Sequence, residues 1–254
     1  MLKISALAVA LAGAATFAHA DDAENAVRIA FAKLAPTAKP EMIQKSEMPG
    51  FYAVLHQGQV FYVSADGKYF IRGDIFNIET KQDVIGHDLA GLRRAGLKDV
   101  PQSKRIVFAP PNPKHTVVVF TDVDCPYCRN FHKQIAAFNQ VGIAVEYVFF
   151  PLSIHPGADA KAVSVWCSQD RNAAYTAAMN GQDPGKKQCA NPVSETLAMG
   201  LKIGIGATPT ILTTDGLQVN GNAAATPQAL LAELDRLDKP AADKPAAAVA
   251  NAPK

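Results

Sequence analysis

The sequence has little net charge, few aromatic residues and few cysteines. Among its 254 residues, 25 are basic and 23 are acidic, and this formal charge of +2 argues against a strongly basic protein that binds nucleic acid. Aromatic residues make up 7%, with one tryptophan, which argues against stacking platforms. No segment after residue 17 is apolar and long enough to span a membrane. The 48% of hydrophobic residues suit a globular protein of one or two domains.

Residues 1–20 have the pattern of a secretory signal peptide. Lys3 is positively charged, an apolar run covers residues 4–17, and residues 18–20 form a small-x-small cleavage site, Ala-His-Ala. The run is shorter than the roughly 20 residues that a membrane span needs, and no cysteine follows the site to carry a lipid anchor. We therefore predict cleavage after Ala20 and export to an oxidising compartment in which disulfides persist.

Residues 21–80 are predicted to form a small N-terminal α+β domain. An amphipathic segment that ends at Pro36 is typical of a helix, and the β-branched and aromatic segments after it are typical of strands, with a hairpin turn at Asp66-Gly67. In chain order, the predicted helix and strands cover residues 22–35, 51–56, 59–64, 68–72 and 76–78. So small a unit holds a marginal core, and pairing with a second copy would help to stabilise it.

Residues 81–104 carry an amphipathic stripe that predicts a helix, either a linker between two domains or a helix of the second one. Residues 105–238 are predicted to form a second domain in which buried strands and helices give an α/β or α+β sheet. Its predicted strands are 105–109, 116–121, 145–151, 208–214 and one more after a turn at 215–216, and its predicted helices are 130–139, 158–169, 171–180, 192–199 and 227–237. Residues 239–254 are rich in Ala, Pro and Lys and are predicted to be a disordered tail.

The motif Cys125-Pro126-Tyr127-Cys128 lies where a β-branched strand passes into a helix. At the first turn of a helix, unpaired N–H groups and the positive end of the dipole stabilise a thiolate, so we expect the pKa of Cys125 to be lowered. Cys128 is better shielded and keeps a higher pKa, and its spacing lets it attack a mixed disulfide at Cys125 and release the partner. Pro126 is tolerated because an N–H in the first turn has no partner. Two acidic residues before the motif should oppose thiolate formation: Asp122 and Asp124.

Three other interpretations of the motif compete with redox chemistry. A zinc site could use both cysteines and His132, but a second clustered ligand pair is missing because Cys167 and Cys189 lie far apart. Haem attachment needs a histidine directly after the second cysteine, where Arg129 stands. A merely structural disulfide remains the serious alternative to redox chemistry in an exported protein.

A second motif, Gly-Ile-Gly-Ala-Thr-Pro-Thr at residues 204–210, leads into a strand. A cis peptide bond at Pro209 could expose the backbone of Thr208 to an extended substrate chain, and an ordinary turn is the alternative. A dinucleotide loop does not fit, because the third glycine and the strand-to-helix context are absent.

The remaining cysteines, Cys167 and Cys189, flank a helical segment with a loop at residues 180–185. In an oxidising compartment we expect them to form a bridge. Closing a loop of this size stabilises a fold by roughly 3 kcal/mol in the chain-entropy description. A second redox pair is the functional alternative.

These segments resemble the DsbC/DsbG family of periplasmic thiol:disulfide interchange proteins over the whole mature chain except the tail. The matching segments are VFYVSADGK at 60–68, FTDVDCPYCR at 120–129, VWCS at 165–168 and GATPT at 206–210. The resemblance implies a V-shaped homodimer with cystatin-like N-terminal dimerisation domains, linker helices and thioredoxin-like catalytic domains that carry a helical insertion. It also implies isomerase activity, chaperone-like binding of unfolded chains and reduction by a DsbD-like membrane electron donor, and neither a cofactor nor a metal is expected.

Carried over by position, the resemblance implies that Cys125 is the nucleophile and Cys128 the resolving thiol. It implies that Thr208-Pro209 is the cis-Pro loop and that Cys167 and Cys189 form a structural disulfide. The dipeptide Pro126-Tyr127 is more like the DsbG branch, whereas the extra cysteine pair is more like DsbC. Isomerisation of wrong disulfides in exported proteins is therefore the first prediction, and reduction of oxidised single cysteines is the alternative. A non-enzymatic holdase is a further hypothesis, while the small N-terminal unit argues against a monomeric oxidase.

Overall fold

The computed structural model describes residues 18–79 and 82–238, and the chain divides into two compact units between Leu89 and Ala90. Residues 1–17 of the predicted signal peptide and the predicted tail at 239–254 lie outside the described residues. Among the helices that are described, none combines the length and the apolar character that a membrane crossing requires.

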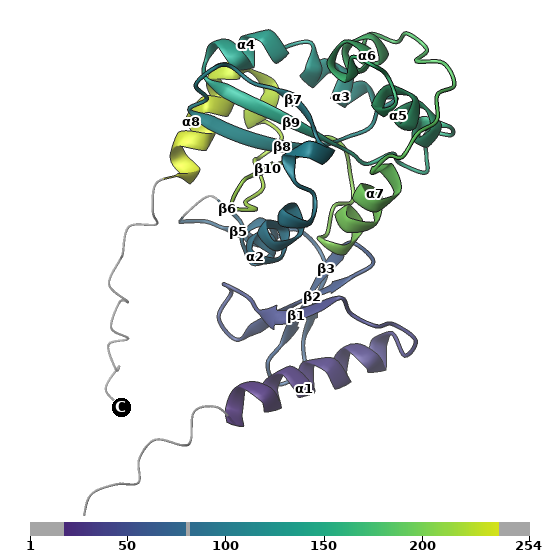
Figure 1. Cartoon of the computed structure of the whole chain (residues 1–254). Coiled ribbons are helices and arrows are strands. Elements are labelled where there is room, and N and C mark those ends of the chain that lie inside the picture. Colours follow the sequence, from purple (N-terminus) through teal and green to yellow (C-terminus); the bar gives the residue numbers. More distant parts are fainter. Residues whose placement is uncertain (1–17, 80–81, 239–254) are drawn as a thin grey trace, which may run out of the picture. The chain divides into compact units, whose positions relative to one another are not determined.

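In the N-terminal unit, one helix packs against a four-stranded antiparallel sheet (Figure 1). The elements are α1 (Ala18–Leu34), β1 (Met42–Lys45), β2 (Phe51–His56), β3 (Gln59–Ser64) and β4 (Phe70–Ile71), in the sheet order β1-β2-β3-β4. Because side chains alternate along a strand, Val54 and Val63 pack against α1, whereas Ala53 and Tyr62 pack with Val84 on the opposite face.

The sequence missed β1, because its four residues show no alternation and three of them are half-buried. A short pair, β5 (Phe76–Asn77) with β6 (Gln82–Asp83), follows the main sheet and leads into α2 (Val84–Asp99). The first turns of α2 supply Val84 to the core of the N-terminal unit, and its last turns supply Leu97 to a core of the second unit. One helix therefore contributes to both units.

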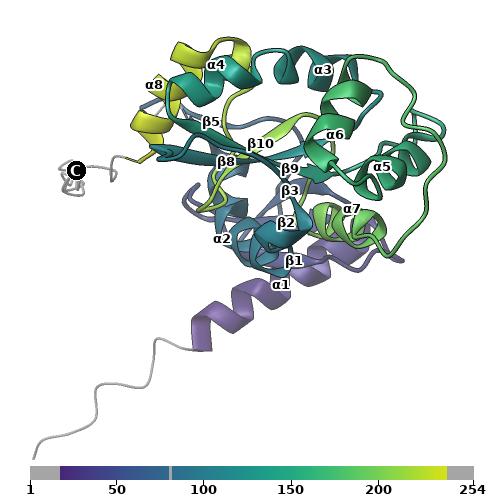
Figure 2. The same ribbon diagram turned by 45° about the horizontal axis from the view of Figure 1, so that its top comes forward.

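The second unit is a four-stranded sheet with helices on both faces (Figure 2). Its strands are β7 (Ile106–Phe108), β8 (His115–Thr121), β9 (Ile143–Phe149) and β10 (Thr210–Thr213), in the order β10-β8-β9-β7. Its helices are α3 (Pro126–His132), α4 (Ile135–Gln140), α5 (Ala158–Trp166), α6 (Arg171–Met179), α7 (Val193–Lys202) and α8 (Pro227–Leu237), with 3-10 turns η1 (Gln102–Lys104) and η2 (Ala223–Ala225). Only β8 and β9 run parallel, and β7 and β10 pair with them antiparallel.

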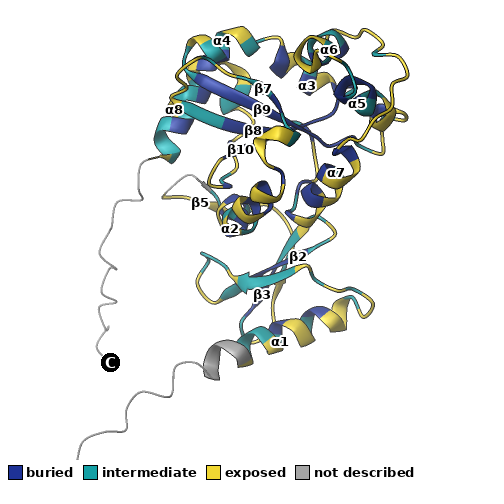
Figure 3. Cartoon of the chain, in the orientation of Figure 1, coloured by how far each residue is buried: buried dark blue, intermediate teal, exposed yellow. Residues whose placement is uncertain are grey.

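The central strands are buried on both faces, as their continuous apolar sequence predicts (Figure 3). Val117 and Val119 join the core beneath α3, α4, α6 and α8, whereas Val118 and Phe120 join the core beneath α7. The carboxyl end of β8 therefore emerges from a buried layer, and the Cys-Pro-Tyr-Cys motif begins four residues after Thr121.

Two expectations for this unit are wrong. The single helix expected at 130–139 is divided into α3 and α4, because Gln134 leaves helical geometry with φ −97° and ψ 7°. Phe131 and Phe138 still stack, with ring centroids 4.7 Å apart, so the apolar periodicity persists across the break and hides it. The strand expected after residues 215–216 is only an isolated bridge between Leu212 and Gln218.

Candidate active site

Cys125 is placed by the end of a strand and the start of a helix. β8 ends at Thr121, residues 122–124 carry the chain across, and Cys125 is the N-cap of α3 with an extended backbone. Pro126 occupies the first turn, where its fixed φ suits a helix and its missing N–H costs no hydrogen bond. This local geometry brings the backbone N–H groups of Tyr127 and Cys128 to the Cys125 sulfur.

The surroundings of Cys125 lower the pKa of its thiol to about 5. The hydrogen bond from the Cys128 thiol is the largest cause, and the Thr208 hydroxyl and the two N–H groups of the first turn add to it. Burial opposes the shift, since the residue is only 3% exposed. At neutral pH the Cys125 sulfur is therefore an anion held by hydrogen bonds.

Cys128 has the opposite character. Its hydrogen bond to Cys125 and its burial, at 1% exposed, raise the pKa of its thiol well above the usual value. Both cysteines are free thiols in the structure. The pair therefore divides into one ionised sulfur and one protonated sulfur, which is the division that attack followed by resolution requires.

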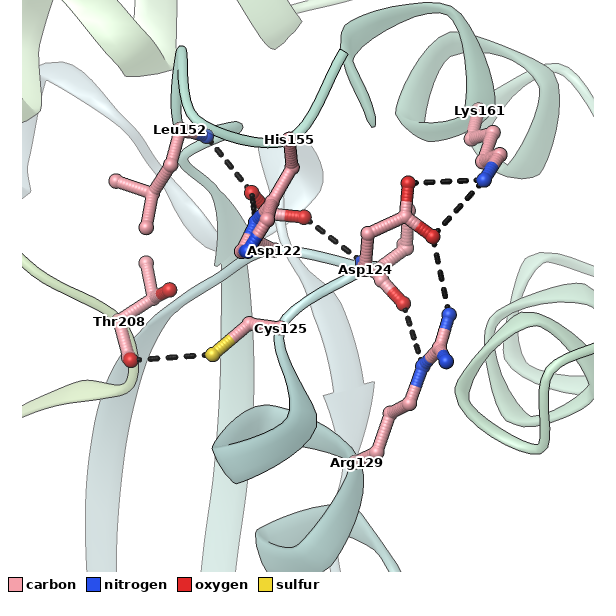
Figure 4. Close-up of polar contacts among 9 residues, drawn as sticks. Asp122, Asp124, Cys125, Arg129, Leu152, His155, Lys161 and Thr208 are labelled. Carbon is pink, nitrogen blue, oxygen red and sulfur yellow. Dashed lines mark hydrogen bonds and ion pairs between the residues drawn. The ribbon is translucent and has the colours of Figure 1, made fainter. Parts of the chain in front are cut away.

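The loop before β10 completes the site. The Thr208 carbonyl oxygen lies 3.3 Å from the Cys125 sulfur, and the peptide bond between Thr208 and Pro209 is cis (Figure 4). The Thr208 hydroxyl is buried and has no hydrogen-bond partner in the structure when Cys125 is a thiol, which leaves it available to the thiolate. The structure thus brings together two motifs that the sequence separates by 83 positions.

The carboxylate of Asp122 holds the active-site loop in place through three hydrogen bonds. It accepts hydrogen bonds from the Asp124 N–H at 2.8 Å, the Leu152 N–H at 2.7 Å and His155 Nδ1 at 2.9 Å (Figure 4). Its residue is 1% exposed, so these donors replace the water that a buried carboxylate loses. Sequence spacing could not reveal this contact, because Leu152 and His155 lie in a loop beyond β9.

Asp124 is paired with two cations. Its carboxylate lies 3.0 Å from Arg129 Nη2 and 2.9 Å from Lys161 Nζ. Arg129 also donates from Nε to the Val123 carbonyl at 2.9 Å. Both acidic residues before the motif therefore have partners: Asp122 accepts three hydrogen bonds, and Asp124 is paired with two cations.

His132 belongs to a buried polar network. Its ring nitrogens lie 3.0 Å from the Tyr147 hydroxyl and 3.0 Å from the Thr176 hydroxyl. Burial lowers the pKa of His132 to about 4, so the ring is neutral at physiological pH. Among the described residues, no cluster of three ligands suits a metal ion, and the zinc interpretation gains no support.

Cys167 and Cys189 form a disulfide with their Cα atoms 5.6 Å apart. Cys167 caps the end of α5, and Cys189 lies in the exposed segment before α7. Around the motif itself, Pro126 is exposed and the Tyr127 side chain is 73% exposed. A partner protein that approaches Cys125 therefore meets Tyr127.

Three features of the site lie at the edge of this sheet: a cysteine with a low pKa at the start of a helix, a shielded cysteine one turn later, and a cis-proline loop against the first sulfur. Together they define a thioredoxin-like thiol–disulfide oxidoreductase. The family comparisons agree with this class. Residues 16–86 match the disulfide bond isomerase protein N-terminal domain, and residues 103–237 match the thioredoxin-like domain.

Curated relatives narrow the class to one family. The thiol:disulfide interchange protein DsbC of Salmonella typhimurium is 32% identical over 89% of this chain and 92% of its own. The protein of the same name from Dickeya dadantii is 33% identical over 92% of this chain and 94% of its own. A disulfide interchange protein from Neisseria gonorrhoeae, solved by crystallography, is 30% identical over 55% of this chain and 99% of its own, with a TM-score of 0.48.

The chain belongs to the DsbC family of thiol:disulfide interchange proteins and is a periplasmic disulfide isomerase. The predictions of an α+β fold with a thioredoxin-like domain, of thiol–disulfide exchange and of isomerase activity are confirmed. The comparisons do not favour a DsbG-like reductase or a holdase without enzymatic activity.

Proposed function

We propose that Cys125 is the nucleophile that opens wrong disulfides in exported proteins and that Cys128 resolves stalled complexes. The observation that carries the proposal is the position of the Cys125 sulfur, at the amino end of α3 and 3.3 Å from the Thr208 carbonyl. The N–H groups of the first turn of α3 stabilise the thiolate there before any substrate binds. The Thr208 carbonyl, which accepts the hydrogen bond of the protonated thiol, belongs to a backbone edge that can align a substrate chain.

In the first step, the Cys125 thiolate attacks one sulfur of the substrate disulfide. A bond forms between Cys125 and that sulfur, and the second substrate sulfur leaves as a thiolate. In the second step, a substrate thiolate attacks the substrate sulfur of the mixed disulfide, forms the correct bond and expels the Cys125 thiolate. No net electron transfer occurs, so the enzyme returns to its reduced form.

The resolving route differs because it oxidises the enzyme. The Cys128 thiol loses its proton and attacks the Cys125 sulfur, a bond forms between the two cysteines, and the substrate leaves as a thiol. Two electrons from an external dithiol must then reduce the pair. A DsbD-like membrane electron donor is the partner that the family resemblance supports for this role.

We also propose roles for the other residues around the motif and for the N-terminal unit. The Thr208-Pro209 loop binds the substrate backbone, Pro126 and Tyr127 set the redox poise, and the bond between Cys167 and Cys189 is structural. The N-terminal unit pairs two chains into a homodimer, in line with the match of residues 16–86 to the isomerase N-terminal domain. Cleavage after Ala20 releases the mature protein.

Refolding of a protein with scrambled disulfides tests the two cysteine roles together. Cys125→Ala should abolish recovery of native enzyme activity, since no other thiolate is placed to attack. Cys128→Ala should still form mixed disulfides, which non-reducing electrophoresis resolves, but should release stalled substrates slowly. Refolding by Cys125→Ala at the wild-type rate would contradict the assignment.

A further inference from the structure

A cavity of about 180 Å³ lies beside the active-site loop. Residues from the loop, α3, α5 and the segment after α6 line it, among them Val123, Asp124, Arg129, Lys161, Gln182 and Asp183. Cys125 itself does not line the cavity, but two lining residues, Val123 and Asp124, directly precede it in the active-site loop. Figure 4 shows Asp124, Arg129 and Lys161 on the side of Cys125 that faces away from Thr208. A substrate chain that is aligned by the Thr208 loop would therefore meet the cavity on its other side.

The hydrogen bonds around the cavity leave cationic donors unused. The Asp124 carboxylate accepts from Arg129 Nη2 at 3.0 Å and from Lys161 Nζ at 2.9 Å at each oxygen, so its acceptors are engaged. Asp183 accepts from the N–H of Gly185 at 2.9 Å within its own loop. An ammonium has three protons and a guanidinium has five, so one proton of Lys161 and the Nη1 group of Arg129 remain for a ligand.

The volume of the cavity limits what it can hold. Sites for small molecules and cofactors usually measure about 300–1,000 Å³, and this cavity is smaller. At about 30 Å³ for each water molecule, this volume corresponds to about six waters, which is enough room for one acidic side chain. A hydrogen-bond acceptor with negative charge fits donors that carry positive charge.

We propose that this cavity is a subsite for an acidic side chain that lies next to the reacting cysteine of the substrate. The ammonium of Lys161, 41% exposed, is the main contact, and Arg129 assists while it holds Asp124. The inference rests on the proposed function of Cys125. It adds a preference for substrates in which Asp or Glu flanks a wrongly paired cysteine.

Peptide disulfides test the subsite directly. Two peptide dimers would be compared that differ only in the residues flanking the bridged cysteine, Glu in one and Gln in the other. The second-order rate constant for their reaction with the reduced full-length protein would be measured by stopped flow near physiological ionic strength. We expect the Glu peptide to react about threefold faster, within the range of an exposed ion pair. Lys161→Gln should bring this ratio to about one, because it removes the contact and leaves the paired Asp124 with Arg129.

Lys133→Gln is the matched control, because Lys133 is an exposed lysine at the end of α3 and the substitution changes the net charge equally. This variant should keep the wild-type ratio. Equal rates for the Glu and Gln peptides with the wild-type protein would overturn the subsite while leaving the role of Cys125 intact. An equal loss of the preference in Lys133→Gln would also overturn the subsite, because the preference would then come from the net charge of the protein and not from a contact in the cavity. Failure of both peptides to react would instead contradict the proposed function.

Discussion

Removal of the Thr208 hydroxyl should measurably raise the pKa of Cys125. The hydroxyl is a buried donor without another partner in the structure, and it lowers the pKa of the Cys125 thiol together with Cys128 and the first turn of α3. Thr208→Val keeps the shape of the side chain and removes this donor. A hydrogen bond to a charged group contributes about 1.5–3 kcal/mol, and about 1.4 kcal/mol corresponds to one pKa unit. The pKa of Cys125 should therefore rise from about 5 to roughly 6–7.

The assay is the thiolate absorbance of the reduced protein at ultraviolet wavelengths, followed as the pH is raised. Thr210→Val is the matched control at the first residue of β10, because the Thr210 hydroxyl donates to the Ala207 carbonyl at 2.7 Å and not to the sulfur. This control should leave the midpoint where it is in the wild type. An unchanged midpoint in Thr208→Val, or an equal shift in both variants, would refute the explanation.

Three further predictions concern stability. The reduced protein should become more stable relative to the oxidised protein as the pH rises from about 5 towards the ordinary thiol pKa of about 8.5. Across that window Cys125 is ionised in the folded chain and protonated in the unfolded one. Urea unfolding of both forms at several pH values checks this, and a stability difference that does not change with pH would contradict it. Replacing Cys167 and Cys189 by Ala should lower the free energy of unfolding by about 3 kcal/mol without moving the pKa of Cys125, and a shifted pKa would show that the bridge belongs to the redox site. Asp122→Asn should cost about 2 kcal/mol in urea unfolding, because buried donors then lose their acceptor, and no loss would contradict the fastening role of Asp122.

The sequence predicted the parts of the site that short motifs carry. Cys125 and Cys128 stand at a strand-to-helix junction, and a separation of three positions is enough to predict that one turn of helix joins them. Pro209 could be placed beside them only as a possibility, because no local pattern fixes a contact across 83 positions. The structure supplies that contact.

The hydrogen bonds that hold the active-site loop could not be predicted from the periodicity of the sequence. The contact of Asp122 with His155 joins residues 33 positions apart, and nothing in the spacing of a loop marks a partner. The division of α3 from α4 was hidden for a related reason, since Phe131 and Phe138 keep the spacing of one continuous helix. Local patterns thus indicated the chemistry, whereas tertiary packing determined the partners of Asp122 and Asp124 beside it.

The most direct test of the account is the alkylation rate of Cys125 with iodoacetamide at pH 5.5, with the modified residue identified by mass spectrometry. A thiol with a pKa of about 5 is mostly ionised at this pH, whereas an ordinary thiol with a pKa of about 8.5 is ionised to roughly one part in a thousand. The lower basicity reduces the reactivity of each thiolate about 40-fold, so Cys125 should react about 20 times faster than free cysteine, with Cys128 unmodified. A Cys125 rate equal to that of free cysteine, or prior modification of Cys128, would contradict the account.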